Sequence, residues 1–117
     1  MGRLTDSGVV DLRSATQRTD FRIDIRTGVG RGPTELAAFD AALRAANIAN
    51  FNLLVLSSVI PPGTEIEVLE DAAEHRPSGD WGDRLYVVMA QERTSVAGQS
   101  VSAGIGWVQD EASGHGL

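Results

Sequence analysis

The stretch Asn52–Pro62, with the sequence NLLVLSSVIPP, is the most informative part of this chain. Its almost unbroken apolar run predicts a strand covered on both faces over residues 52–60. The pair Pro61–Pro62 ends that strand, because proline has no amide hydrogen to donate to a sheet. Two adjacent serines, Ser57 and Ser58, lie near its end, and buried hydroxyls there would need hydrogen-bond partners.

The residues before this stretch predict a strand, a turn and a helix. Apolar and charged residues alternate over residues 21–26, which is the pattern of a strand with one dry face. The glycine-rich residues 28–33 predict a tight turn rather than a phosphate loop, because the full phosphate-binding motif is missing. Apolar residues then recur at helical spacing over residues 35–46, with Thr34 as the N-cap and Asn47 as a left-handed exit.

The residues after this stretch predict further β-structure. Three more strands are expected, at residues 64–69, 84–91 and 100–108. Residues 93–99 would join the last two as a hairpin, and residues 110–114 predict another turn, after which 115–117 would start a return strand. This order of one helix and several strands indicates an α+β fold rather than alternating parallel units. One helix cannot cover both faces of such a sheet, so either subunits cover one another or the protein continues further.

The bulk properties are those of one acidic domain. The chain has 117 residues and a formal net charge of −6. We expect a domain at residues 21–117, incomplete at its C-terminus, after a loose polar arm at residues 1–20. The negative charge disfavours nucleic acid or anionic membrane as a partner, because both attract cationic surfaces. Cysteine is absent from the sequence, which excludes disulfides, a thiolate nucleophile and a cysteine-based metal site.

Targeting and metal signals are also lacking. Apolar runs fall short of the roughly 18 residues of a membrane span, and the N-terminus lacks the apolar region of a secretory signal. We therefore expect a cytoplasmic protein. His75 and His115 are far apart in the sequence and lack the spacing of metal ligands, so both are expected to be solvated and no metal site is predicted.

The serine pair has two explanations. On spacing alone, the simpler one is favoured, in which the serines end a strand before the prolines turn the chain. In the other, the Ser58 hydroxyl attacks the Ser57 carbonyl carbon, and β-elimination and hydrolysis of the resulting ester leave a pyruvoyl group and ammonia. That route needs a distorted peptide, a donor to the developing oxyanion and exclusion of competing water. The amide of Asn52 is a suitable donor.

Three segments together resemble the pyruvoyl-dependent arginine decarboxylase family. They are PTELAAFDAAL at residues 33–43, IANFNL at residues 48–53 and SSVIPP at residues 57–62. The glycine-rich residues before them and the predicted later strands also fit, so the resemblance runs from about residue 21 to the end. It implies a mainly antiparallel sheet sandwich with a flanking helix, of the αββα type.

The resemblance also implies roles for individual residues. The chain would be cut between Ser57 and Ser58, and Ser58 would become the pyruvoyl group. Asn52 matches the family asparagine that assists processing. Asp40 matches the carboxylate that receives the substrate guanidinium, a charge-assisted pair that can be bidentate. The apolar walls of the substrate pocket would be Leu36 and Val59.

The implied reaction is decarboxylation of L-arginine to agmatine and CO2, with the pyruvoyl group as electron sink. The resemblance further implies a homotrimer or a dimer of trimers with active sites between subunits. The proton-donating glutamate of the family lies a few residues beyond a Gly-Leu such as Gly116–Leu117, and this sequence contains no match for it. Two alternatives stay open, namely a truncated or unprocessed, non-catalytic oligomeric subunit, and a decarboxylase for another amino acid.

Overall fold

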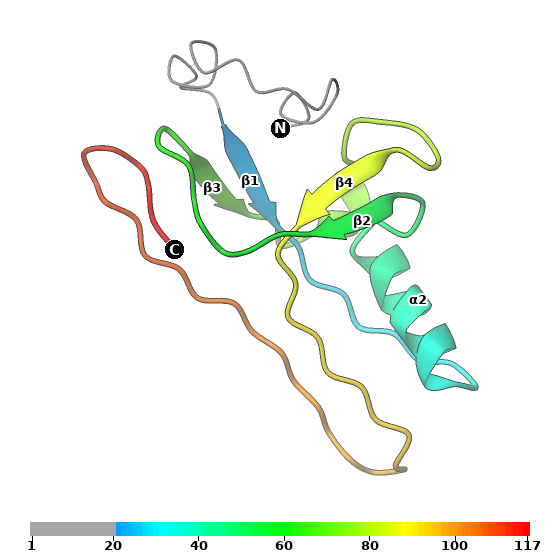
Figure 1. Cartoon of the computed structure of the whole chain (residues 1–117). Helices are drawn as coiled ribbons and strands as arrows, with labels where there is room; N and C mark the ends of the chain where they lie inside the picture. The colour runs from blue at the N-terminus through cyan, green and yellow to red at the C-terminus, as the bar shows by residue number, and fades with distance from the viewer. Residues whose placement is uncertain (1–20) are drawn as a thin grey trace.

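The computed structural model describes residues 21–117, and the expected arm at residues 1–20 lies outside the described residues (Figure 1). The elements in chain order are β1 (Arg22–Ile25), α2 (Glu35–Ala45), β2 (Asn52–Val55), β3 (Glu65–Val68), the 3-10 helix η2 (Ala72–Glu74) and β4 (Arg84–Val87). β1, α2 and β3 confirm the strand, helix and strand predicted at residues 21–26, 35–46 and 64–69.

The strands form two separate parallel pairs, so the predicted antiparallel sandwich is wrong. β1 pairs with β3, with Arg22 opposite Glu65, and β2 pairs with β4, with Asn52 opposite Arg84. Alternation of apolar and polar residues indicates which side of a strand is dry, but it does not indicate the direction of the neighbouring strand. Here long connections join the paired strands, and such connections allow parallel pairing.

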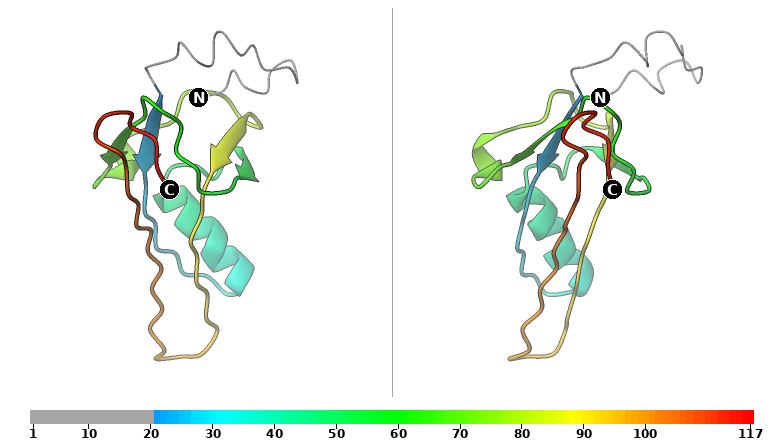
Figure 2. Two further views of the ribbon diagram at one scale, coloured as in Figure 1. Left: turned by 60° about the vertical axis from the view of Figure 1, so that its left-hand side comes forward. Right: turned by 90° about the vertical axis from the view of Figure 1, so that its left-hand side faces the viewer.

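Residues 88–108 form an extended arm, and the strands predicted there are largely absent. The predicted strand 84–91 is limited to β4, and within the described residues no strand is formed at 100–108. The chain does turn at the tip of the arm, where the Gln99 amide donates to Val96 O at 3.2 Å. However, the two legs of the arm run apart in Figures 1 and 2, so the predicted hairpin is wrong as a paired structure.

Helix α2 begins and ends as its sequence predicts. The Thr34 hydroxyl accepts a hydrogen bond from the Ala37 amide at 3.0 Å, which is N-capping. Asn47 has φ of 64°, the left-handed exit expected of this residue. Glu35 lies in the first turn and Arg44 in the last turn, where each charge interacts favourably with the helix dipole.

The glycine-rich segment at residues 28–32 runs extended along α2 instead of forming a tight turn (Figure 1). A Cβ atom on Gly30 would clash with Ala38 O and Ala42 N, and one on Gly28 would lie 2.9 Å from Ala46 N. The spacing agrees because two extended residues span about 6.6 Å and four helical residues about 6 Å. We call this contact the glycine–alanine interface. Glycine is needed here for close approach of two backbones, not for a turn.

A small core lies where the end of α2 meets β2 and β4. Ala46, Ile48 and Phe51 are buried there, with exposed fractions of 6–8%. Three partly buried side chains pack against them, namely Leu43, Leu53 and Leu85. This cluster fixes the end of the helix and the start of β2 relative to each other.

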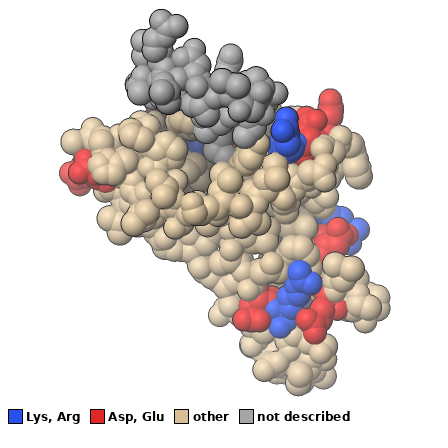
Figure 3. Space-filling view, viewed as in Figure 1, with Lys and Arg blue, Asp and Glu red and all other residues tan. Residues whose placement is uncertain are grey.

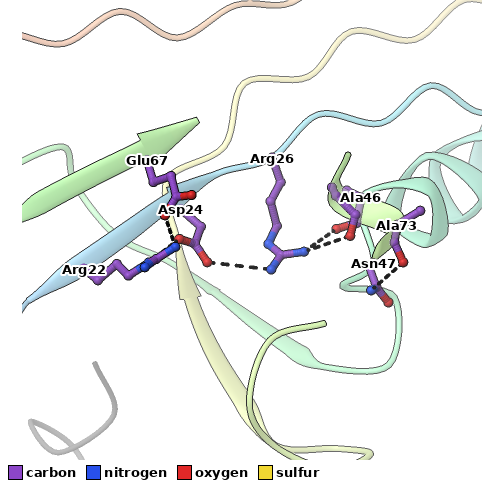
Figure 4. A network of polar contacts seen from close by, with 8 residues as sticks. Arg22, Asp24, Arg26, Ala46, Asn47, Glu67 and Ala73 are labelled. Atoms are coloured by element: carbon purple, nitrogen blue, oxygen red, sulfur yellow. Dashed lines mark hydrogen bonds and ion pairs between the residues drawn. The ribbon is translucent and has the colours of Figure 1, made fainter. Parts of the chain in front are cut away.

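Arg26 ties β1 to the end of α2 and to η2 (Figure 4). Its guanidinium donates to Ala46 O at 3.2 Å and to Ala72 O at 3.3 Å, and its side chain is only 10% exposed. The Asn47 amide group adds a hydrogen bond to Ala73 O at 3.3 Å. Since the carbonyls at a helix end lack partners within the helix, a cation placed there stabilises it.

Candidate active site

Ser57 and Ser58 lie directly after β2, between two anchored residues. Before them, the Leu56 amide donates to Val87 O at 2.8 Å, which extends the pairing with β4 by one residue. After them, Ile60 exchanges two backbone hydrogen bonds with Gly116, at 2.8 and 3.1 Å. Both serines are exposed, and within residues 21–117 neither hydroxyl has a hydrogen-bond partner. The bond between them is therefore held at both sides and open to its surroundings.

The prediction that this strand is covered on both faces is wrong for the described residues. β2 is exposed except at the half-buried Leu53. Val55 is 67% and Val59 68% exposed. The physical reason is that β2 has one neighbouring strand, and the core at the end of α2 covers it only at Leu53. Figure 3 shows the corresponding face as a broad surface with few charges.

The C-terminal residues form a turn that brings Gly116 beside Ile60. The Asp110 carboxylate accepts hydrogen bonds from the amides of Ala112 and Ser113 at 2.9 and 3.0 Å. These bonds, first that of Ser113 and then that of Ala112, hold the pKa of Asp110 below its usual value. Gly116 pairs antiparallel with both Ile60 and Gln109, which confirms the predicted turn and return segment.

Asn52 does not contact the serine pair in this structure. It begins β2, and its side-chain amide donates to Gly82 O at 2.6 Å. Six positions separate Asn52 from Ser58, and an extended chain advances about 3.3 Å per residue. The predicted processing residue therefore stabilises the loop before β4, and a single copy of the described chain does not bring it to Ser58.

Asp40 and Leu36 are exposed residues of α2. This helix lies apart from the chain that follows β2 and carries the serine pair (Figures 1 and 2). The Leu36 side chain is 69% exposed. Asp40 forms an ion pair with Arg44 one turn later, with 3.5 Å between Oδ2 and Nη2. The residues predicted for processing and for substrate binding are thus not assembled in one copy of the described chain.

Two arginine contacts on this helix were not predicted. The Arg44–Asp40 pair could have been found from its i,i+4 spacing. Arg93, from the arm, places its Cζ atom 4.1 Å from the centroid of the Phe39 ring, within the range of a cation–π contact. No sequence signal links these two residues, because they are far apart along the chain.

Other features of the described residues lie away from these positions. The open hollows beside β1, β3 and residues 74–78 include none of the predicted site residues. His75 and His115 are both exposed, as predicted. In the part of the chain that the structure describes, no group of three or more acidic, histidine or cysteine side chains could hold a metal ion. None of its helices is long and apolar enough to cross a membrane.

Comparison with known proteins defines the class as that of the pyruvoyl-dependent decarboxylases. More specifically, the chain belongs to the pyruvoyl-dependent arginine decarboxylase family, whose model matches residues 22–117. No solved structure matches the chain.

Several archaeal relatives are described as pyruvoyl-dependent arginine decarboxylases. A protein of Halobacterium salinarum is 44% identical over 94 residues, which cover 80% of this chain and 56% of the relative. One of Picrophilus torridus is 38% identical over 80 residues, covering 68% of this chain and 42% of the relative. One of Archaeoglobus fulgidus, with the number 2 in its name, is 36% identical over 80 residues, covering 68% and 49%. The chain thus spans about half the length of these relatives.

Proposed function

We propose that the protein is a self-processing enzyme that decarboxylates L-arginine to agmatine and CO2. Membership of the family supports this proposal. The observation that carries it is the Ser57–Ser58 bond, whose two exposed hydroxyls have no partner within residues 21–117 and which is flanked by the anchored Leu56 and Ile60. A free hydroxyl can turn toward the preceding carbonyl, and the anchors limit the movement of the chain around it.

The proposed processing uses atoms of the two serines and one water molecule. The Ser58 hydroxyl adds to the carbonyl carbon of Ser57, and the bond from that carbon to the Ser58 nitrogen breaks as the ester forms. β-Elimination then releases the Ser57 carboxylate and leaves dehydroalanine at position 58. Tautomerisation and hydrolysis replace the nitrogen by oxygen, giving pyruvoyl and ammonia. The chain ends as two fragments, residues 1–57 and 58–117.

The serine pair fits this group chemically, since the residue that supplies its carbon atoms follows another serine and its hydroxyl is unengaged. Once formed, a pyruvoyl carbonyl supplies an electron sink for the loss of CO2. We assign to the Asp40 carboxylate the binding and orientation of the substrate guanidinium. Leu36 and Val59, both largely exposed, would exclude water from the substrate once they are covered.

We further propose that an oligomer, a homotrimer or a dimer of trimers, assembles this site. In one copy of the described chain, α2 with Asp40 lies apart from the serine pair. The apolar side chains exposed beside the serines, including those of Val55 and Val59, are those that a subunit contact would bury. An assembly that buries them can also bring Asp40 of one copy to Ser58 of another.

The antiparallel contact of Gly116 with Ile60 suggests how a longer chain would complete the site. Because antiparallel partners run in opposite directions, the two positions after Leu117 would lie opposite Ser58 and Ser57 if a chain continued in the same register. The resemblance expects the proton-donating glutamate close to these positions. In such a chain, this glutamate would reach the substrate from a strand beside the pyruvoyl group.

Denaturing mass spectrometry of the purified protein tests the processing. We expect two fragments, with the one that starts at residue 58 lighter by one ammonia than the same fragment with an N-terminal serine. Ser58→Ala should stay intact, whereas the exposed Ser78→Ala should be cut like the wild type. An intact wild-type chain would overturn self-processing and favour the alternative, a non-catalytic oligomeric subunit, which the separation of the predicted site residues also supports.

Release of CO2 from L-arginine, L-ornithine and L-lysine tests the substrate. We expect turnover of arginine, and Asp40→Asn should raise KM for arginine more than it lowers kcat. Removing a charge-assisted contact typically costs about 1.5–3 kcal/mol, or roughly 10- to 100-fold in kcat/KM. Preferred release of CO2 from ornithine or lysine would overturn the substrate assignment while leaving the processing intact.

A further inference from the structure

Helix α2 already holds a guanidinium group at the carboxylate assigned to the substrate. The Asp40 carboxylate faces the guanidinium of Arg44 one helical turn later, with 3.5 Å between Oδ2 and Nη2. Within residues 21–117, Asp40 has no second cationic partner. The proposed substrate and Arg44 therefore both carry a guanidinium group, and both would bind the Asp40 carboxylate.

We propose that Arg44 is an internal competitor that occupies Asp40 until a free guanidinium ligand displaces it. The inference rests on the proposed role of Asp40 in binding arginine. Arg44 would lower the affinity of Asp40 for every cationic ligand by the same factor, because each ligand must displace the guanidinium already present. An ammonium ligand lacks the planar set of donors with which a guanidinium ligand would replace Arg44.

The contact is weak enough for such an exchange. Both side chains are largely exposed, 65% for Arg44 and 54% for Asp40. Exposed pairs at i,i+4 stabilise a helix only slightly, and water screens them. The cost of releasing Arg44 corresponds to roughly a twofold change in ligand affinity. The Arg44 side chain can move further into solvent at little cost, because it is already mostly exposed and is not part of the core cluster.

Arg93 provides a matched control on the same helix. Its guanidinium lies over the Phe39 ring and its Nε atom donates to Gln91 Oε1 at 3.0 Å, so it does not occupy Asp40. Removing Arg93 takes away one positive charge near α2 without releasing the Asp40 carboxylate. It therefore separates general electrostatic attraction of a cation from the specific exchange at Asp40.

The test is an NMR titration of the protein with agmatine at low ionic strength, following the backbone amide of Asp40. Agmatine carries a guanidinium group and no carboxylate, so it cannot be decarboxylated during the titration. We expect Arg44→Met to bind agmatine roughly twofold more tightly than the wild type. Arg44→Lys should show a smaller gain, because lysine keeps the charge but not the planar fork. Arg93→Met should bind like the wild type.

The outcomes separate this inference from the proposed function. If Asp40→Asn abolishes binding while Arg44→Met leaves it unchanged or weakens it, Asp40 is the receptor and the competition is wrong. If Arg93→Met tightens binding as much as Arg44→Met, the effect is general electrostatics and the competition is also wrong. If Asp40→Asn binds agmatine like the wild type, both the assigned role of Asp40 and the competition fail.

Discussion

The glycine–alanine interface and the serine segment, residues 55–59, are packed in opposite ways. In the first, the backbones of residues 28–32 and α2 lie so close that a single added carbon atom has no room. In the second, large apolar side chains such as Val55 and Val59 remain mostly exposed. The first region is complete within the described chain. The second region is as apolar as a protein interior but is exposed like a surface. A contact with another protein chain would bury its apolar side chains.

Adding one methyl group to the closed region should cause the largest loss of stability. Gly30→Ala places a Cβ atom against Ala38 O and Ala42 N, two backbone atoms that cannot rotate away. We expect the free energy of unfolding to fall by about 3 kcal/mol, the upper end of the usual range for overpacking. Urea unfolding followed by circular dichroism measures it.

Gly104→Ala is the matched control, because nothing lies within 4 Å of a Cβ atom built on this residue of the arm. Its effect should stay within about 1 kcal/mol in either direction. Equal losses in the two variants would mean that the close approach of the segment and α2 is not what stabilises this region.

The network around Arg26 should give the next largest effect. Arg26→Met removes the guanidinium that donates to Ala46 O and Ala72 O, and leaves both carbonyls without that donor. We expect a loss of about 1–3 kcal/mol in the free energy of unfolding, because hydrogen bonds of charged groups in partly buried places contribute this much.

Arg22→Met tests whether position or charge explains the loss at Arg26. Arg22 contacts Asp24 and Glu67 but its side chain is 55% exposed, so the contacts are screened by water. Its replacement should therefore cost less stability than that of Arg26. A larger loss of stability for Arg22→Met than for Arg26→Met would mean that Arg22, and not Arg26, is the arginine that stabilises this part of the fold.

The open region should respond differently, since its apolar side chains do little for a single chain. Val59→Thr should change the free energy of unfolding by less than about 0.5 kcal/mol under conditions in which the protein is monomeric. If subunits cover this surface, the same variant should weaken association, which sedimentation velocity measures. A large loss of monomer stability would contradict the exposed position of Val59.

Local sequence signals predicted the closed region better than the open one. Thr34, the helical spacing and Asn47 gave the bounds of α2 almost to the residue, because capping and left-handed exits depend on neighbouring residues. The direction of strand pairing depends on distant residues, and the parallel pairs were missed for that reason. The glycines at 28–32 were assigned to a turn because sequence alone does not distinguish a positive φ from a close approach.

The predicted site shows the same limit. The serine pair was found because it is contiguous, but the strand predicted over residues 52–60 ends at Val55, so the serines follow β2 instead of lying within a strand. Its burial was predicted wrongly, since an apolar run indicates that a strand is covered but does not indicate which element or subunit covers it. Contacts across long separations, such as Arg93 on Phe39, carry no local signal at all.

The C-terminal turn holds the chain directly after the serines and should show the smallest effect, as a dependence on pH. The amides of Ser113 and Ala112 hold the pKa of Asp110 below its usual value, so the carboxylate stabilises the turn fully above the pKa of an unfolded aspartate, near 3.8. That contribution is lost as the pH falls through the lower pKa of the folded state. We expect the protection of the Gly116 amide, which donates to Ile60 O, to decrease below pH 3.8 in hydrogen-exchange experiments.

Asp110→Asn and Glu111→Gln separate this cause from general acid unfolding. The amide introduced by Asp110→Asn keeps an oxygen acceptor but cannot titrate, so the acid-induced loss of protection at Gly116 should shrink while protection at neutral pH falls slightly. Glu111 is exposed in the same turn and accepts no hydrogen bond within residues 21–117, so Glu111→Gln should behave like the wild type. The charge of His115 also lowers the pKa of Asp110. His115→Gln should therefore reduce the pH dependence of protection at Gly116 without removing it. If Asp110→Asn loses protection at low pH as steeply as the wild type, the Asp110 carboxylate does not hold Gly116 beside Ile60.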